Sequence, residues 1–291
     1  MGKFDQYLLH PVEREIREDD ACIELICSKD HPILPFFYES RYIRKDYVLA
    51  DRPYALANSE ILVFTNTEPD NEMLGATLSI TIGGKELTTD RNCMIAVPAF
   101  VPHGPIKLTN VTSTVLSYIA APAREHISMP ESFWAAECPA PQDCILYYNG
   151  DAEDPERRFG NEQNIIMKMV RNPLPGSTFS ILRRFYPTQN KWTFASGSHL
   201  HDNMEILCFY PGDPSDPYHI HGECEMVLFG EKHIIDRPTV AYFPPYLPHC
   251  PLNICHLESN MFWHSYAPDF EQYTATKVDE LGEDPAIFAP W

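Results

Sequence analysis

Four residues in the second half of this 291-residue chain have the types and spacing of ligands for a transition metal. His199 and His201 are two positions apart, so on a β-strand both side chains would project from the same face. Glu205 has the same parity, and His249 follows later, within a proline-rich segment. Three neutral imidazoles and one carboxylate suit a divalent ion of Fe, Mn, Ni, Zn or Cu and leave coordination positions open for substrate. The pattern predicts one such metal ion per chain, with Fe or Mn favoured.

These residues lie in the second copy of an internal repeat. The segment 60–64, Glu-Ile-Leu-Val-Phe, returns as Glu-Ile-Leu-Cys-Phe at 205–209. An Asp-Arg pair and three prolines around His103 return in the same order around His249, and the spacing between the copies is nearly constant. A repeat of this length indicates two copies of one structural unit, and missing it would mis-assign the fold.

The first copy lacks the two early histidines. Tyr54 and Leu56 stand in their places, and a leucine side chain has no donor atom. Glu60 and His103 remain, but two ligands rarely suffice to hold a metal. We therefore expect the first half to bind no metal tightly and the second half to carry the function.

The composition describes a packed globular protein made of short strands. The apolar content of 44% is that of a folded chain, and the length suits two domains. Alternating apolar and polar residues at 77–82 and 225–229, each followed by a glycine turn, predict β-strands at equivalent places in the two copies. Such strands suggest a β-sandwich or small barrel in each half. Helical pattern is confined to 131–137 and to 155–170, where Asn161 could cap a helix.

Charge, cysteines and the N-terminus limit the partners and the compartment. The formal net charge of −19 would repel a phosphate backbone, so we expect no nucleic-acid partner. The chain has no apolar run near the roughly 20 residues of a membrane span, and no signal-peptide core at its start. The nine scattered cysteines fit buried free thiols in a reducing compartment. We expect a cytoplasmic protein with a small-molecule substrate and no membrane partner, and a homo-oligomer is compatible with the sequence.

The chain resembles the cupin superfamily, and specifically the bicupins, which carry two tandem cupin domains. The first family motif, H-x-H, three or four residues, E, six residues, G, is matched by His199, His201, Glu205 and Gly212. The second, P-x-G, two residues, H, three residues, N, is matched by Pro244, His249 and Asn253. The sequence departs from these motifs at Thr193 and Tyr246, where the family has glycine. The resemblance covers most of residues 40–120 and 180–266.

The resemblance implies an all-β fold of two tandem cupin barrels, of the double-stranded β-helix or jelly-roll type, with few short helices. The N-terminal barrel, residues 1–122 with an N-terminal extension, would be degenerate. A connecting segment would follow at 123–165, and the metal-binding barrel with its tail would occupy 166–291. The acidic tail from Asp269 could pack across the partner domain.

A second histidine pair offers a rival site. His219, His221 and Glu225 also spell H-x-H-x-x-x-E, with all three on one face of a predicted strand. The repeat argues against this group as the main ligand set, because His221 aligns with Leu74, well after Glu60. The face could be a ligand set, a substrate-facing polar wall or a solvated strand surface.

Other residues are candidates for a substrate pocket. Arg183 and Arg184 precede the histidine motif on a predicted strand. An arginine inside a barrel would bind a carboxylate or enolate, whereas one outside would form surface ion pairs on this acidic protein. Aromatic residues could form the pocket wall or pack in the core. The candidate pocket residues are Arg184, Tyr210, His219, His221, Glu225, Trp263 and His264.

The resemblance implies a metal-dependent enzyme acting on a small oxygenated molecule, either a phenolic compound, a diketone, or a hydroxy or keto acid. The implied reaction is C–C bond cleavage, with the metal as a Lewis acid or as the O2-binding centre of a dioxygenase. A non-oxidative isomerase, lyase or hydrolase could use the same ligands, and O2 consumption would separate the two classes. A binding, sensory or storage cupin would act without turnover, because one fold hosts many functions. The sequence assigns no general base.

Overall fold

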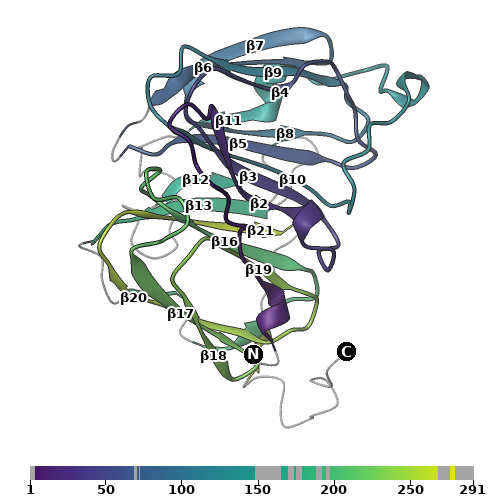
Figure 1. Cartoon of the computed structure of the whole chain (residues 1–291). Coiled ribbons are helices and arrows are strands. Elements are labelled where there is room, and N and C mark those ends of the chain that lie inside the picture. Colours follow the sequence, from purple (N-terminus) through teal and green to yellow (C-terminus); the bar gives the residue numbers. More distant parts are fainter. Residues whose placement is uncertain are drawn as a thin grey trace. The chain divides into compact units, whose positions relative to one another are not determined.

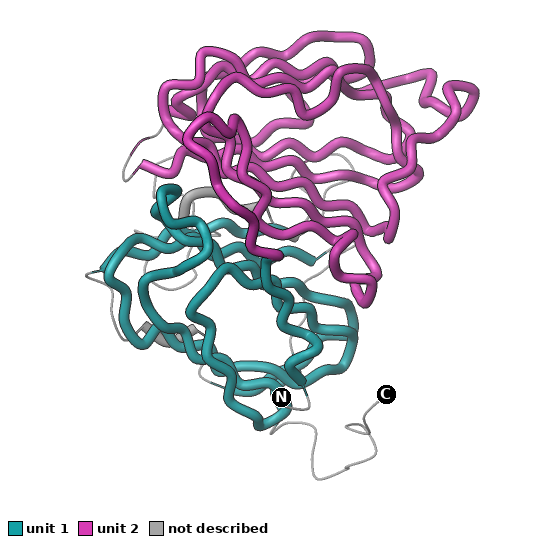
Figure 2. Tube along the Cα trace, viewed as in Figure 1, with its two compact units in different colours: residues 1–11, 152–171, 179–291 teal, residues 12–151, 172–178 magenta. Residues whose placement is uncertain are grey.

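The chain divides into two compact units, each described by itself (Figures 1 and 2). The computed structural model describes residues 4–68, 71, 73–147, 165–169, 174, 179–187, 192–194, 197–267 and 276–278, with 165–169, 179 and 192–194 described by their backbone alone. The N-terminal unit comprises Val12–Asp151 and Asn172–Thr178. The C-terminal unit comprises Met1–Pro11, Ala152–Arg171 and Phe179–Trp291.

Two antiparallel sheets form the N-terminal unit (Figure 1). One has six strands in the order β11-β8-β5-β10-β3-β2, and the other has four in the order β4-β9-β6-β7. The strands are β2 (Cys22–Cys27), β3 (Phe37–Ile43), β4 (Tyr47–Ala50), β5 (Glu60–Asn66), β6 (Met73–Ile82), β7 (Lys85–Arg91), β8 (Cys93–Val97), β9 (His103–Thr109), β10 (Val115–Ala121) and β11 (Ile145–Tyr147).

Two antiparallel sheets also form the C-terminal unit. One has the order β1-β19-β16-β21-β13-β12, and the other has the order β18-β17-β20-β15-β22, with β14 also paired to β20. The strands are β1 (Leu8–Leu9), β12 (Ile165–Met169), β13 (Phe179–Phe185), β14 (Trp192–Phe194), β15 (His199–Leu200), β16 (Glu205–Pro211), β17 (Gly222–Leu228), β18 (Glu231–Ile235), β19 (Thr239–Phe243), β20 (His249–Leu257), β21 (Met261–Ala267) and β22 (Thr276–Lys277).

The all-β fold class predicted from the sequence is confirmed. The helical elements in the described part of the chain are the 3-10 turns η1 (Asp5–Tyr7), η2 (Ser28–Asp30), η3 (Glu131–Phe133) and η4 (Pro141–Cys144), and residues 187 and 278 are also in 3-10 conformation. The helix expected over 155–170 is wrong where the structure describes it, because Ile165–Met169 is strand β12 and pairs with β13. A short apolar run fits a buried strand as well as a helix. The remainder of that segment, with Asn161, lies outside the described residues.

Strand parity places one carboxylate at the inner face of each unit. In β5, Phe64 belongs to the hydrophobic core of the N-terminal unit, and Glu60 has the same parity. In β16, Phe209 belongs to the core of the C-terminal unit, and Glu205 has the same parity. Because alternate side chains share a face of a strand, both carboxylates project toward the core side of their sheets.

The internal repeat extends to details of the backbone. Phe100 and Tyr246 occupy equivalent positions and both adopt left-handed backbone angles, with φ of 64° and 66°. The N–H of Phe100 donates to the Leu56 carbonyl at 2.7 Å, and that of Tyr246 donates to the His201 carbonyl at 2.7 Å. Tyr246 therefore keeps the conformation that a glycine adopts most easily, although the motif glycine is missing.

The two units differ from the boundaries expected from the sequence. Residues 4–11 belong to the C-terminal unit, because β1 pairs with β19. Residues 123–147, expected in a connecting segment, belong to the N-terminal unit, and β11 pairs with β8 there. The described part of the acidic tail, β22, pairs with β15 of its own unit. These pairings involve short strands that carry no sequence signal of their partner.

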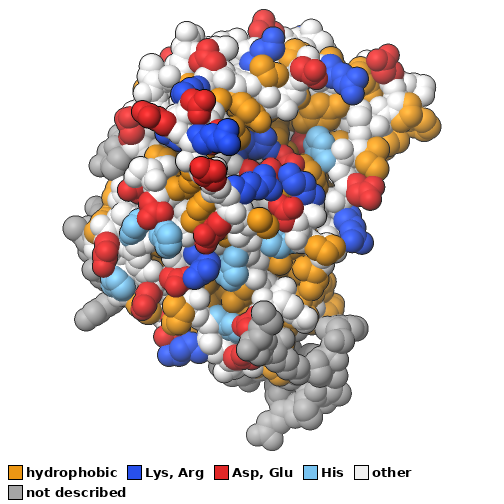
Figure 3. All heavy atoms as spheres, viewed as in Figure 1, with side chains coloured by type: hydrophobic (Ala, Val, Ile, Leu, Met, Phe, Trp, Pro, Cys, Tyr) orange, Lys and Arg blue, Asp and Glu red, His pale blue; other side chains and the backbone are white. Residues whose placement is uncertain are grey.

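Three further features concern the surface charges, the cysteines and the helices of the chain. On the face shown in Figure 3, acidic and basic side chains are interspersed. All nine cysteines are free thiols. In the described ranges, none of the helices is long and apolar enough to cross a membrane.

Candidate metal centre

The four predicted ligands converge inside the C-terminal unit. Their ligand atoms all lie within 4.8 Å of one another, and all four side chains are buried. His199 pairs directly with His249 across β15 and β20, while Glu205 begins β16. Oε2 of Glu205 lies 3.1 Å from Nε2 of His201 and 3.0 Å from Nε2 of His249. The fold thus assembles the group that the sequence spacing singled out.

Hydrogen bonds between Nδ1 and backbone carbonyls orient the rings of two histidines, which leaves Nε2 of each ring available to the group. Nδ1 of His249 lies 3.0 Å from the Leu247 carbonyl oxygen, and Nδ1 of His199 lies 3.2 Å from the Gly197 carbonyl oxygen. A carbonyl oxygen only accepts, so Nδ1 carries the proton and a neutral imidazole then presents an Nε2 lone pair. Nε2 of His249 lies 3.0 Å from Oε2 of Glu205, a distance at which either a hydrogen bond or a shared cation can join the two atoms. The set of three imidazoles and one carboxylate therefore fits a divalent transition metal.

The electrostatics favour the ligating form of these groups. Burial would raise the pKa of Glu205, but hydrogen bonds from His201 and His249 hold it below its usual range. Burial, helped by the nearby His249, lowers the pKa of His199 to about 4. At neutral pH the carboxylate is therefore ionised and the His199 imidazole is neutral, which are the forms that bind a metal.

Two residues that sequence reasoning missed hold the ligands in place. Ser265 on β21 donates its hydroxyl hydrogen to Oε1 of Glu205 at 2.8 Å. Phe243 on β19 stacks on the ring of His249, with centroids 4.2 Å apart and planes 4° apart. The parity of β21 could have indicated Ser265, because it has the same parity as the core residue Trp263 and so lies on the face of the sheet that carries Glu205. Both contacts fix side-chain orientation without occupying a ligand position.

The equivalent place in the N-terminal unit holds a different polar cluster. Tyr54 donates its hydroxyl hydrogen to Oε2 of Glu60 at 2.9 Å, and Nε2 of His103 lies 2.5 Å from the same oxygen. His126 supplies a further imidazole, with Nε2 2.6 Å from Oε1 of Glu60. Burial would raise the pKa of Glu60, but hydrogen bonds from His103 and His126 lower it to about 2. Sequence reasoning missed His126, because it lies in the segment taken as a connection and outside the repeat.

Sheet parity separates the predicted pocket residues. Trp263 belongs to the core of the C-terminal unit, on the face of the four candidate ligands. Tyr210, His264 and Arg184 have the opposite parity and lie on the other face of the sheet. Arg183, and not Arg184, is on the inner face, with its guanidinium 5.8 Å from the centre of the Trp263 ring. The structure therefore places Tyr210, His264 and Arg184 on the face of the sheet opposite the candidate metal centre.

The rival histidine pair faces solvent. Nδ1 of His219 lies 2.8 Å from Asp216, and Nε2 of His221 lies 3.0 Å from the same carboxylate. Glu225 on β17 forms an ion pair with Lys232 at 2.8 Å. The core-facing residues of β17 alternate with Glu225, so its carboxylate is on the outer face. His219 and His221 precede β17, which begins at Gly222, so the expectation that they share a strand face with Glu225 is wrong, and the group forms part of the solvated surface.

Comparison with known proteins shows similarity of fold. No protein-family model matches the chain, and no curated protein matches it at a significant level. A variant of oxalate decarboxylase from Bacillus subtilis is 13% identical with a TM-score of 0.54, over 97% of this chain and 82% of that one. Procruciferin, an 11S globulin from Brassica napus, is 9% identical with a TM-score of 0.60, over 95% and 87%. The 7S globulin of Momordica charantia is 9% identical with a TM-score of 0.56, over 94% and 87%.

These structures are bicupins, and the present chain has the same fold. Its N-terminal and C-terminal units therefore have the fold of two tandem cupin barrels, as the motifs in the sequence indicated. The His-His-Glu-His group lies in the second of them. At this level of identity the likeness covers the fold and leaves the function to the site itself.

Proposed function

We propose that the C-terminal cupin domain is the active site of a metal-dependent enzyme that cleaves a C–C bond in a small oxygenated molecule. The substrate class is a phenolic compound, a diketone, or a hydroxy or keto acid. The observation that carries this proposal is the buried group of three imidazoles and one carboxylate, with Nε2 of His249 facing Glu205. The fold similarity to an oxalate decarboxylase, an enzyme for a small organic acid, supports it.

The chain's own residues would bind the ion and control its surroundings. His199, His201, Glu205 and His249 would be the ligands, with Fe or Mn favoured among first-row divalent ions. A bound ion of this kind supplies Lewis-acid or O2-binding chemistry. Ser265 engages one oxygen of Glu205, which leaves the other oxygen directed at the histidines. The buried apolar side chains around the group exclude water, and this strengthens electrostatic interactions there.

Two other classes of function compete with this proposal. A non-oxidative isomerase, lyase or hydrolase could use the same four ligands. A non-catalytic cupin is supported by the fold similarity to two globulins, whose TM-scores are as high as that of the oxalate decarboxylase. Four buried potential ligands lie close enough to share one ion, and this favours a metal-dependent function over a purely structural one. A buried carboxylate is costly unless it is paired or coordinates a metal.

Turnover by the purified full-length protein tests the proposal. Catechol, acetylacetone, lactate and oxaloacetate represent the four substrate types, and their loss would be followed by chromatography together with O2 uptake. We expect metal-dependent consumption of one type, slowed at least roughly tenfold by Glu205→Gln, which removes the charge and keeps the shape. Glu223→Gln, at an exposed position on β17, is the matched control.

The outcomes separate the competing classes. Consumption of O2 with the substrate supports a dioxygenase, and turnover without O2 supports the non-oxidative class. If no substrate type is consumed, the non-catalytic class is favoured. If Glu205→Gln keeps its full metal content and turnover, Glu205 is not a ligand.

A further inference from the structure

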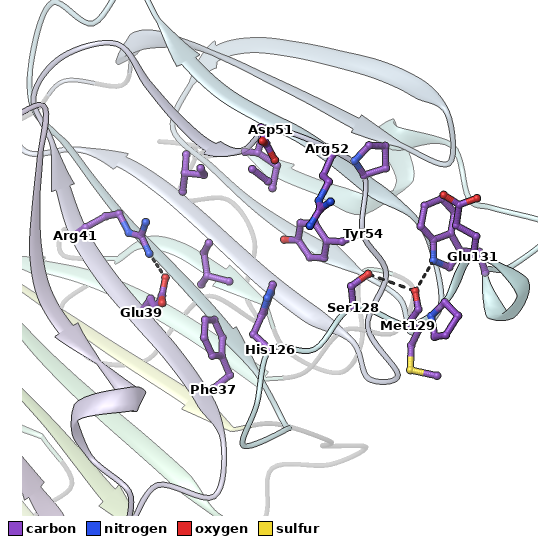
Figure 4. A pocket seen from close by; sticks show the side chains of 17 residues that line it. Phe37, Glu39, Arg41, Asp51, Arg52, Tyr54, His126, Ser128, Met129 and Glu131 are labelled. Atoms are coloured by element: carbon purple, nitrogen blue, oxygen red, sulfur yellow. Dashed lines mark hydrogen bonds and ion pairs between the residues drawn. The ribbon is translucent and has the colours of Figure 1, made fainter.

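The N-terminal domain contains a cavity of about 650 Å³ that the proposed function does not use. Its wall includes the inner face of β3, the residues after β4, and the segment 126–134 (Figure 4). Glu39 and Arg41 of β3 line it, with Tyr54 and His126 beside them. Pockets for small molecules have volumes of roughly 300–1,000 Å³, so this cavity has the size of a ligand site.

The residue paired with Arg41 is smaller than its equivalent in the C-terminal domain. Arg41 of β3 pairs with Ser117 of β10. At the equivalent place in the C-terminal domain, Arg183 of β13 pairs with Trp263 of β21, whose ring fills the core. The two arginines therefore have different surroundings. Arg183 packs against an aromatic ring, whereas Arg41 borders a cavity.

Some of the charged groups that line the cavity already form ion pairs within this domain. Arg41 forms an ion pair with Glu39 on the same strand. His126 is paired at 2.6 Å with the buried carboxylate of the N-terminal polar cluster. Asp51, Arg52 and Glu131 also line the cavity, but their side chains are exposed to solvent. A charged ligand inside the cavity would compete with the Glu39–Arg41 pair and leave one partner uncompensated, which is costly for a group that is largely buried.

We propose that this cavity binds a neutral, hydroxyl-rich small molecule, of the class of monosaccharides and polyols. Carboxylate oxygens accept hydrogen bonds from hydroxyl groups and guanidinium N–H groups donate them, so Glu39 and Arg41 can each bind a hydroxyl without burying net charge. Phe37, Tyr54 and Trp134 line the same cavity and offer rings that pack on the C–H faces of a sugar. No metal is needed for these contacts. The site is therefore independent of the function proposed for the other domain.

Calorimetric titration of the full-length protein with neutral probes tests this site. The probes are glucose, mannose, arabinose, xylitol and glycerol, with oxalate and glycine as charged comparisons. We expect at least one neutral probe to bind at one site per chain, and Ser128→Trp to weaken its binding by roughly tenfold or more. Ser128 lines the cavity from an exposed position, so a larger side chain there fills the cavity without disturbing the core. Lys85→Trp, at the exposed start of β7 and outside the cavity lining, is the matched control and should bind normally.

Two further variants make the outcome decisive. Glu39→Gln keeps the shape of the side chain but removes an ion-pair partner, so it should also weaken binding of the neutral probe. His249→Ala should leave that binding unchanged, because it alters only the other domain. The proposal is overturned if no neutral probe binds, if only the charged probes bind, or if Ser128→Trp binds as tightly as the unaltered protein.

Discussion

Nε2 of His126 lies 2.6 Å from Oε1 of Glu60, so a residue beyond β10 completes a polar cluster that begins on β5. Tyr54 and His103 approach the other oxygen of the same carboxylate. In the C-terminal domain the equivalent carboxylate faces the Nε2 atom of His249. The two copies thus surround one carboxylate differently, with a phenol and an extra imidazole in the first and a set of potential metal ligands in the second.

The pair of Glu60 and His126 should make stability depend on pH. Burial would raise the pKa of Glu60, but hydrogen bonds lower it to about 2, so its contribution is present above the usual 4.5 and is lost as the pH falls through about 2. Burial would lower the pKa of His126, but Glu60 raises it above the usual 6.5. The His126 contribution is therefore full below 6.5 and is lost as the pH rises through the raised value. The pair stabilises most between about pH 4.5 and 6.5.

Replacement of His126 tests this pH dependence. His126→Gln should lower the free energy of unfolding by about 1–3 kcal/mol near pH 5.5, because a neutral amide replaces the charged partner of a buried carboxylate. Near pH 9 the deficit should be smaller. Urea denaturation at both pH values measures it, with His256→Gln at an exposed position of β20 as the control. An equal deficit at the two pH values would contradict the ion pair.

The hydroxyl of Ser265 should strengthen metal binding through Glu205. Ser265→Ala removes the hydrogen bond to Oε1 and leaves the four proposed ligands in place. We expect metal affinity to fall by roughly 10-fold to 100-fold, as is typical when a ligand loses its supporting hydrogen bond. Competition with a chromogenic chelator measures the affinity. The control is Ser259→Ala, because the Ser259 hydroxyl donates to the Ile220 carbonyl and not to a proposed ligand. This variant should bind metal as tightly as the unaltered protein.

The left-handed backbone at Tyr246 should make a glycine stabilising there. With φ of 66° and an exposed side chain, Tyr246→Gly relieves the conformational cost of a side chain while losing little packing. We expect the free energy of unfolding to rise by about 0.5–1 kcal/mol. Tyr246→Ala keeps a Cβ atom and should give no such gain. Equal stabilities of the glycine and alanine variants in urea denaturation would refute this explanation.

Much of the fold could be predicted because the sequence contains two copies of one pattern. The alternation around 77–82 and 225–229 falls within β6 and largely within β17, and the repeat identified two units of one kind. Long-range pairings could not be predicted. The dipeptide Leu8–Leu9 carries no signal that it joins β19, and the apolar run Ile165–Met169 has no feature that separates strand from helix.

The candidate site was predictable where its residues are close in the sequence. The separation of His199, His201 and Glu205 indicated one group, although they lie on β15, just after it and on β16, and the repeat indicated His249. Parity alone could have placed Tyr210 on the face opposite Glu205, because the two are separated by an odd number of positions on β16. His126 could not have been found in this way, since its contact with Glu60 depends on the path of a loop.

Metal content of the purified protein tests the central claim most directly. Elemental analysis of full-length protein prepared without chelators or added metal should find one first-row transition metal ion per chain. His199→Ala and His249→Ala should lose it, because each removes one of the four proposed ligands. His103→Ala, the equivalent change in the first domain, should keep it. Full metal content in the His199 and His249 variants, or loss of metal only in His103→Ala, would show that the C-terminal group is not the metal centre.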